Sequence, residues 1–122
     1  MNPGNIPECP ASTILALQDC LTALNGKWKV PIIGTLFFGP KRFKDLEETI
    51  KKITPRMLSK ELKELELNNI IRRNIYNTRP IRIEYELTES GKTLEPILEA
   101  MVDWGSKHRN DVFGNPDRTT NR

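Results

Sequence analysis

Thiol and imidazole groups, which act as nucleophiles and metal ligands, occur at only three positions of this sequence, Cys9, Cys20 and His108. The two cysteines lack the spacing of a zinc site, and the single histidine follows far along the chain, so we expect no metal. No spacing supports a Cys–His or Ser–His–Asp nucleophile, and no glycine-rich phosphate loop occurs. The sequence therefore argues against an enzyme, and we expect no cofactor.

Basic side chains are concentrated in the middle of the chain. Residues 27–82 contain 14 Lys and Arg against 6 Asp and Glu, whereas the other residues contain 5 against 10. This segregation favours a polyanion as the partner of the middle segment. The alternative is an ordinary solvated surface.

The spacing of apolar residues predicts four helices in the first part of the chain, at about 11–24, 28–38, 42–50 and 55–67. Pro31 fits the second helix only within its first turn, where a missing N–H has no partner to lose. Thr54 is expected to cap the fourth helix, and Pro55 to occupy its first position.

After residue 69 the apolar pattern changes from a helical period to the two-residue period of a strand. We expect strands at 70–76 and 81–87, joined by a hairpin loop, and a last helix from Thr88 to about His108. The predicted fold is mainly α with a small β-hairpin, a winged helix-turn-helix in the order α-α-α-α-β-β-α. It comprises a flexible arm at 1–10, one domain at 11–109 and a disordered tail at 110–122.

The fourth predicted helix has the two faces of a DNA recognition helix. Leu58, Leu62 and Leu65 form a stripe that would pack on the domain, and basic residues lie opposite, where a major groove would meet them. Arg79 in the hairpin loop is the candidate for the minor groove. Lys29, Lys41 and Arg42 are candidates for phosphate contacts. The expected DNA-binding residues are Thr54, Pro55, Arg56, Ser59, Lys60, Lys63, Arg79, Lys41, Arg42 and Lys29.

The first and last predicted helices carry more apolar surface than one thin domain can bury. We expect part of this surface to pack against a second copy of the chain across a two-fold axis. The alternative is that the domain's own core absorbs it. The expected dimer-interface residues are Leu94, Ile97, Leu98, Met101, Trp104, Ile14 and Leu17.

Several short segments together resemble the HxlR-type regulators, a family related in architecture to the MarR-type winged helices. The resemblance spans about residues 9–108, and Pro31 and Gly34 depart from its pattern, so we expect the second helix to start late or to bend. The matching residues are Asn25-Gly26-Lys27-Trp28, Gly39-Pro40-Lys41-Arg42-Phe43, Leu46, Ile53-Thr54-Pro55-Arg56-Met57-Leu58, Leu62, Leu65-Glu66, Tyr85-Glu86-Leu87-Thr88 and Asp103-Trp104.

The resemblance implies a homodimeric transcription regulator that binds double-stranded DNA and whose inducer is unknown. Several members sense thiol reagents through a cysteine near the N-terminus, a location that Cys9 matches. A thiol at the positive start of a helix would be more reactive than a free one, whereas Cys20 is expected to be a small core residue. The alternatives are a Cys9 without regulatory use and a winged helix that binds only proteins. No secretory or membrane-spanning segment occurs, so we expect a cytoplasmic protein.

Overall fold

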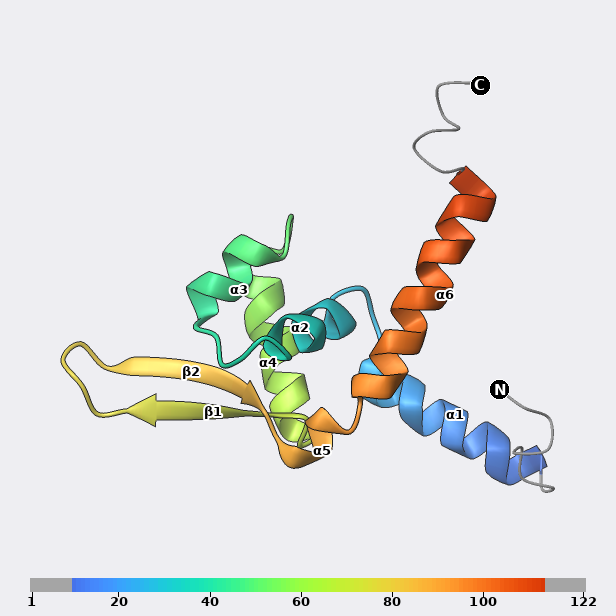
Figure 1. Ribbon diagram of the computed structural model, residues 1–122. Coiled ribbons are helices and arrows are strands. Elements are labelled where there is room, and N and C mark those ends of the chain that lie inside the picture. The colour runs from blue at the N-terminus through green and yellow to red at the C-terminus, as the bar shows by residue number, and fades with distance from the viewer. Residues whose placement is uncertain (1–9, 114–122) are drawn as a thin grey trace.

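The computed structural model describes residues 10–113 and has the predicted winged-helix order, with one helix more than expected (Figure 1). Helices and a two-stranded antiparallel hairpin follow one another along the chain. Their bounds are α1 Pro10–Leu24, α2 Lys29–Leu36, α3 Phe43–Thr49, α4 Pro55–Leu67, β1 Ile71–Tyr76, β2 Arg82–Leu87, α5 Glu89–Lys92 and α6 Glu95–Phe113.

The core lies where α2, α3 and α4 meet the root of the hairpin. The predicted leucine stripe of α4, Leu58, Leu62 and Leu65, is fully or almost fully buried. Leu46 of α3 is also buried, whereas Phe43 only packs on the edge of the core. The remaining buried apolar residues are Ile32, Ile33, Leu36, Ile50, Ile53, Ile70, Ile71, Leu87 and Leu98.

The last helix was predicted as one piece, and the structure divides it in two. α5 ends at Lys92 and α6 begins at Glu95. Pro96 explains the break, because a continuous helix would require a backbone N–H at this position and would place the proline ring against a carbonyl of the preceding turn. At the first turn of a new helix neither cost arises.

The predicted tail boundary at residue 110 was wrong, because α6 continues to Phe113. No glycine or proline occurs between Gly105 and Gly114, so nothing in the sequence stops the helix at His108. The expected arm and the rest of the expected tail lie outside the described residues, apart from Pro10, which is the first residue of α1.

Two groups of elements project from the core in different directions (Figure 1). The hairpin extends to one side, and α1 and α6 extend to the other. Within residues 10–113, no helix is long and apolar enough to cross a membrane.

Candidate nucleic-acid interface

Helix α4 is capped and oriented as a recognition helix requires. The Thr54 hydroxyl accepts a hydrogen bond from the backbone N–H of Met57 at 3.1 Å, and Pro55 is the first helical residue. With its leucine stripe in the core, α4 exposes the opposite face. The exposed positions include Arg56, Ser59, Lys60 and Lys63.

These basic side chains are available to a polyanion. In the part of the chain that the structure describes, Arg56, Lys60 and Lys63 form no ion pair with an acidic side chain. The free N–H groups at the start of α4 add the positive end of the helix dipole beside Arg56. The exposed face of α4 therefore combines fixed charge with hydrogen-bond donors, as a phosphate backbone requires.

The loop before α3 is held against the hairpin by its backbone. Lys41 and Tyr85 exchange two backbone hydrogen bonds, 2.9 Å from Lys41 N to Tyr85 O and 2.7 Å from Tyr85 N to Lys41 O. The next residue, Arg42, donates its backbone N–H to the Asp45 carboxylate at 3.0 Å and thereby starts α3. The Arg42 side chain is exposed, and Lys41 is half-buried.

The hairpin has a polar face held by side-chain contacts. The Glu86 carboxylate accepts hydrogen bonds from Arg72 Nε at 2.7 Å and from Asn74 Nδ2 at 2.6 Å. Nearer the tip, the Arg82 guanidinium lies 4.3 Å from the centre of the Tyr76 ring. These contacts occupy Arg72 and Arg82, whereas Arg79 in the loop is exposed.

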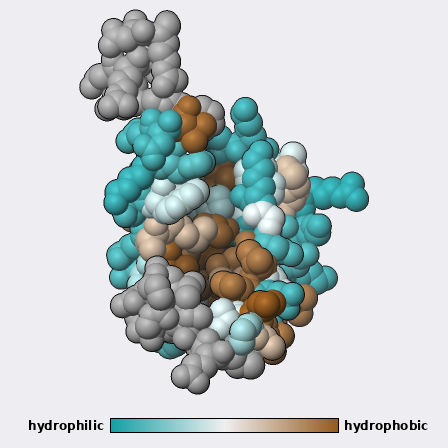
Figure 2. All heavy atoms as spheres, turned by 90° about the vertical axis from the view of Figure 1, so that its right-hand side faces the viewer, coloured by the Kyte–Doolittle hydropathy of each residue, from teal (hydrophilic) through white to brown (hydrophobic). Residues whose placement is uncertain are grey.

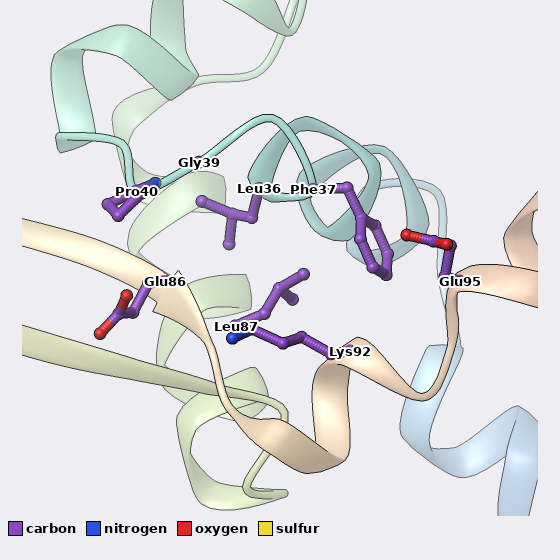
Figure 3. A pocket seen from close by; sticks show the side chains of 8 residues that line it. All are labelled: Leu36, Phe37, Gly39, Pro40, Glu86, Leu87, Lys92 and Glu95. Atoms are coloured by element: carbon purple, nitrogen blue, oxygen red, sulfur yellow. The ribbon is translucent and has the colours of Figure 1, made fainter.

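The base of the hairpin meets α2 and α5 around a hollow of about 350 Å³ (Figure 3). Leu36 of α2 points toward Leu87 of β2, and the Lys92 side chain runs from α5 toward the end of β2. The burial of Leu36 and Leu87 anchors the hairpin to the core. Ile75, Ile81 and Ile83, farther out, are exposed because the hairpin extends beyond the domain.

Lys29 was predicted to contact phosphate, and the structure contradicts this. The residue is only 2% exposed, and its ammonium donates to Glu61 at 2.9 Å and to Glu64 at 2.5 Å. These hydrogen bonds and charges raise the pKa of Lys29 against the opposing effect of burial. Two carboxylates of α4 therefore hold Lys29 inside the protein.

Glu61 and Glu64 were not among the predicted site residues, although the apolar pattern of α4 gives a signal for Glu61. Glu61 falls on the same stripe as Leu58, Leu62 and Leu65, and it is 8% exposed. A carboxylate on an apolar stripe requires a cation or donor beside it, since an unpaired buried charge is very costly. That requirement points to a buried basic partner, although not to Lys29 in particular.

The outer surfaces of α1 and α6 carry large exposed apolar side chains, and α1 has no buried residue at all. Figure 2 shows apolar side chains gathered on this side of the molecule and bordered by hydrophilic ones. We call this set of residues the α1–α6 face. Its members are Ile14, Leu15, Leu17, Leu21, Ile97, Met101, Val102 and Trp104.

Two expected interface residues belong to the domain's own core instead. Leu98 is 7% exposed and is part of the core cluster, and Leu94 packs against that cluster. Leu98 lies on the side of α6 that meets the domain, and Leu94 lies in the short connection between α5 and α6. Leu15, Leu21 and Val102 were not among the expected interface residues, and they are exposed as well.

Of the two cysteines, only Cys20 lies within the described residues. Cys9 lies outside the described residues and immediately precedes α1. Cys20 was expected in the core, but it is exposed on α1 and is a free thiol. The reason is that α1 contacts the core only through Ala23 and Leu24 at its C-terminal end, and none of its residues is fully buried.

Comparison with known proteins agrees with this geometry. Residues 23–113 match the model of the HxlR-like helix-turn-helix family, which is most of the chain. The chain belongs to this family. It is therefore a DNA-binding transcription regulator and not an enzyme.

Individual relatives match over most of the chain. The HTH-type transcriptional regulator YtcD of Bacillus subtilis is 40% identical over 100 residues, 82% of this chain and 79% of YtcD. Among solved structures, the redox regulator HypR in its reduced form has a TM-score of 0.77 and 37% identity, covering 82% of this chain and 99% of HypR. Reduced YodB from B. subtilis has a TM-score of 0.67 and 35% identity, covering 87% and 95%.

Proposed function

We propose that this regulator binds an inverted-repeat operator as a homodimer, with α4 of each subunit in the major groove. The observation that carries the proposal is the exposed face of α4, where Arg56, Lys60 and Lys63 lie opposite a buried leucine stripe. A helix with this division of faces can enter a groove without losing its own packing. Ser59 on α4 and Thr54 at its N-cap add short polar groups for contacts with base edges or phosphates.

The hairpin supplies a second contact in this proposal. The Arg79 side chain is exposed at the tip of the hairpin. It is proposed to enter the minor groove of the DNA, because a narrow minor groove concentrates negative potential. Arg42, and the half-buried Lys41 beside it, lie on the loop that is joined to β2, and they are proposed to position the domain on phosphates.

Dimerisation is proposed through the α1–α6 face. Isolated helices of about 15 residues are marginal in water, and α1 buries none of its residues within the described chain. A second copy that covers Ile14, Leu17, Ile97, Met101 and Trp104 would provide the missing packing. A two-fold axis would place two recognition helices about 34 Å apart, on successive turns of the duplex.

Selection of bound sequences from a random DNA pool tests this proposal, followed by titration of the selected operator at increasing salt. We expect an inverted repeat, and binding that weakens by orders of magnitude between about 50 and 200 mM salt. Lys63→Ala should reduce the slope of log affinity against log salt by about 1. Lys107→Ala, on α6, is the matched control and should leave the slope unchanged.

Two outcomes would refute DNA recognition by this face. One is a pool in which no sequence is enriched at any ionic strength. The other is an affinity that scarcely changes with salt, which would favour a protein partner for the winged helix.

We also propose that Cys9 makes the regulator responsive to thiol reagents. The support is that HypR is described as a redox regulator with reduced and oxidised forms, and that YodB was solved in diamide-treated and quinone-bound forms. In this chain Cys9 directly precedes Pro10, the first residue of α1, and α1 contributes to the proposed dimer face. A thiolate there would lie near the positive end of a helix dipole.

N-ethylmaleimide tests the thiol, because the thiolate sulfur adds to one alkene carbon and the other takes a proton from water. Since Cys20 is exposed, every sample carries Cys20→Ser. Operator affinity is measured with and without the reagent, in protein that retains Cys9 and in Cys9→Ser. We expect the reagent to weaken binding only where Cys9 is present. Equal affinities in all four samples would end the sensor hypothesis.

A further inference from the structure

The buried ion pair between α2 and α4 connects the core to the proposed DNA-binding face. Lys29 is the first residue of α2, and its ammonium reaches Glu61 and Glu64, which lie one turn apart on α4. The Glu61 side chain is 11% exposed, whereas the Glu64 side chain is 39% exposed and reaches solvent. The two carboxylates therefore occupy different positions, one inside the domain and one at its edge.

Glu64 lies about one helical turn from a cation of the DNA-binding face. Residues four apart on a helix are neighbours, and opposite charges at this spacing attract each other. Lys60 stands four residues before Glu64, and its charge contributes to lowering the pKa of the Glu64 carboxyl, after the larger effect of Lys29. In the structure Glu64 bonds to Lys29, and Lys60 forms no ion pair within residues 10–113.

We propose that Lys29 is a positioning residue for DNA binding, which keeps Glu64 turned toward the domain and so leaves Lys60 free for phosphate. The inference rests on the proposed function of α4. Without the Lys29 ammonium, the Glu64 carboxylate has no partner on α2 and swings to the Lys60 ammonium one turn away. The Lys60 ammonium is then paired within the protein and is less available to phosphate. In addition, the Glu64 carboxylate lies beside the DNA backbone and repels it.

Glu61 has a different task in the same cluster. Because its side chain is almost buried, its carboxylate depends on Lys29 for a partner, and losing that partner destabilises the fold. Glu61 therefore links Lys29 to stability, and Glu64 links Lys29 to DNA binding. This division allows the two effects to be measured separately.

The test uses a protein that carries Glu61→Gln, so that removal of Lys29 leaves no charge buried without a partner. Lys29→Met, Lys60→Met and both together are added to it, and operator affinity is measured for each after circular dichroism has shown a folded protein. Lys29→Met should weaken binding about twofold, which is the strength of an ion pair four residues apart on a helix, and reduce the salt slope by up to about 0.9. The double variant should be no weaker than Lys60→Met alone, because both changes remove the same contact.

Rescue separates this mechanism from a structural role for Lys29. Adding Glu64→Gln to the Lys29→Met protein removes the charge that captures Lys60, so affinity and salt slope should return to those of the Glu61→Gln reference. Losses that add in the double variant, or no recovery with Glu64→Gln, would overturn the inference. Equal affinity of the Lys29→Met protein and its reference would do the same. If the unsubstituted chain selects no operator, the proposed function fails instead, which is a distinct result.

Discussion

A Cβ atom on Gly91 would lie 2.1 Å from the carbonyl oxygen of Ile70. Gly91 is in α5, and Ile70 immediately precedes β1, so this close approach packs the short helix onto the base of the hairpin. The Ile70 carbonyl also accepts a hydrogen bond from the Thr88 N–H at 3.0 Å and cannot withdraw without losing it. Gly91→Ala should therefore lower the free energy of unfolding by roughly 1–3 kcal/mol, as overpacking does. Urea denaturation measures the change.

Gly34 is the matched control, since it also lies in a helix but has room. A Cβ there would lie 4.0 Å from Leu98 Cδ2, an ordinary contact. Gly34→Ala should raise the free energy of unfolding by up to about 1 kcal/mol, because alanine favours the helix. If both alanines shift stability in the same direction, the packing described for Gly91 is wrong.

The cap of α4 yields a second prediction. Thr54→Ala removes the hydroxyl that accepts from the Met57 N–H, and it should lower the free energy of unfolding by about 1 kcal/mol. Thr49, at the exposed end of α3, accepts no such bond from a helix start, so Thr49→Ala should cost clearly less. Thermal unfolding of the two variants compares them directly, and equal losses would contradict the capping role.

The fold could be predicted from the sequence because its local patterns agree with its packing. The leucine stripe of α4 and its Thr54-Pro55 start give both the element and its buried face. The predicted helix boundaries were wrong where a single residue changed the backbone against the periodic pattern around it. Pro96 divides the last helix. The outer isoleucines of the hairpin alternate as in a half-buried strand, but Ile75, Ile81 and Ile83 are exposed.

The candidate site could be predicted only where local charge decides it. Arg56, Lys60 and Lys63 are exposed because they oppose the apolar stripe on the same helix. The burial of Lys29 depends on its ion pairs with residues 32 and 35 positions later in the chain. No local sequence pattern predicts which basic residue pairs with a buried glutamate. Leu98 shows the same difficulty for apolar residues, because an apolar helix side does not reveal whether its own domain or a partner covers it.

The proposed dimer makes a prediction about solution mass. Met101→Asp places a charge in the α1–α6 face, and burying it without a partner would cost about 3 kcal/mol or more, at least roughly a hundredfold in the dissociation constant. Leu67→Asp is the control, since Leu67 is 78% exposed at the end of α4. Sedimentation velocity should show dissociation only for Met101→Asp. A dimer unaffected by this change, or an unsubstituted chain that is monomeric at micromolar concentration, would contradict the proposed interface.

The lowered pKa of Glu86 leads to a prediction of how the stability of the protein depends on pH. Hydrogen bonds from Asn74, and then from Arg72, lower the pKa of the Glu86 carboxyl below its ordinary value of 4.5 in the folded protein. A carboxyl whose pKa is lower folded than unfolded contributes stability above the unfolded value and loses it as the pH falls through the folded one. The difference in unfolding free energy between the unsubstituted chain and Glu86→Gln should therefore be largest near neutral pH and shrink below about pH 4.5.

Urea denaturation between about pH 3 and pH 7 measures this difference, and Asn74→Ala supplies its control. Because the Asn74 amide is the largest cause of the lowered pKa, the same Glu86→Gln comparison in an Asn74→Ala protein should depend less on pH. Some dependence should remain, because Arg72 still donates to Glu86 and Lys92 adds a smaller attraction from α5, where its side chain runs toward the end of β2 (Figure 3). A difference that is constant across the pH range, or one that grows in acid, would show that the carboxylate of Glu86 does not stabilise the hairpin through its charge.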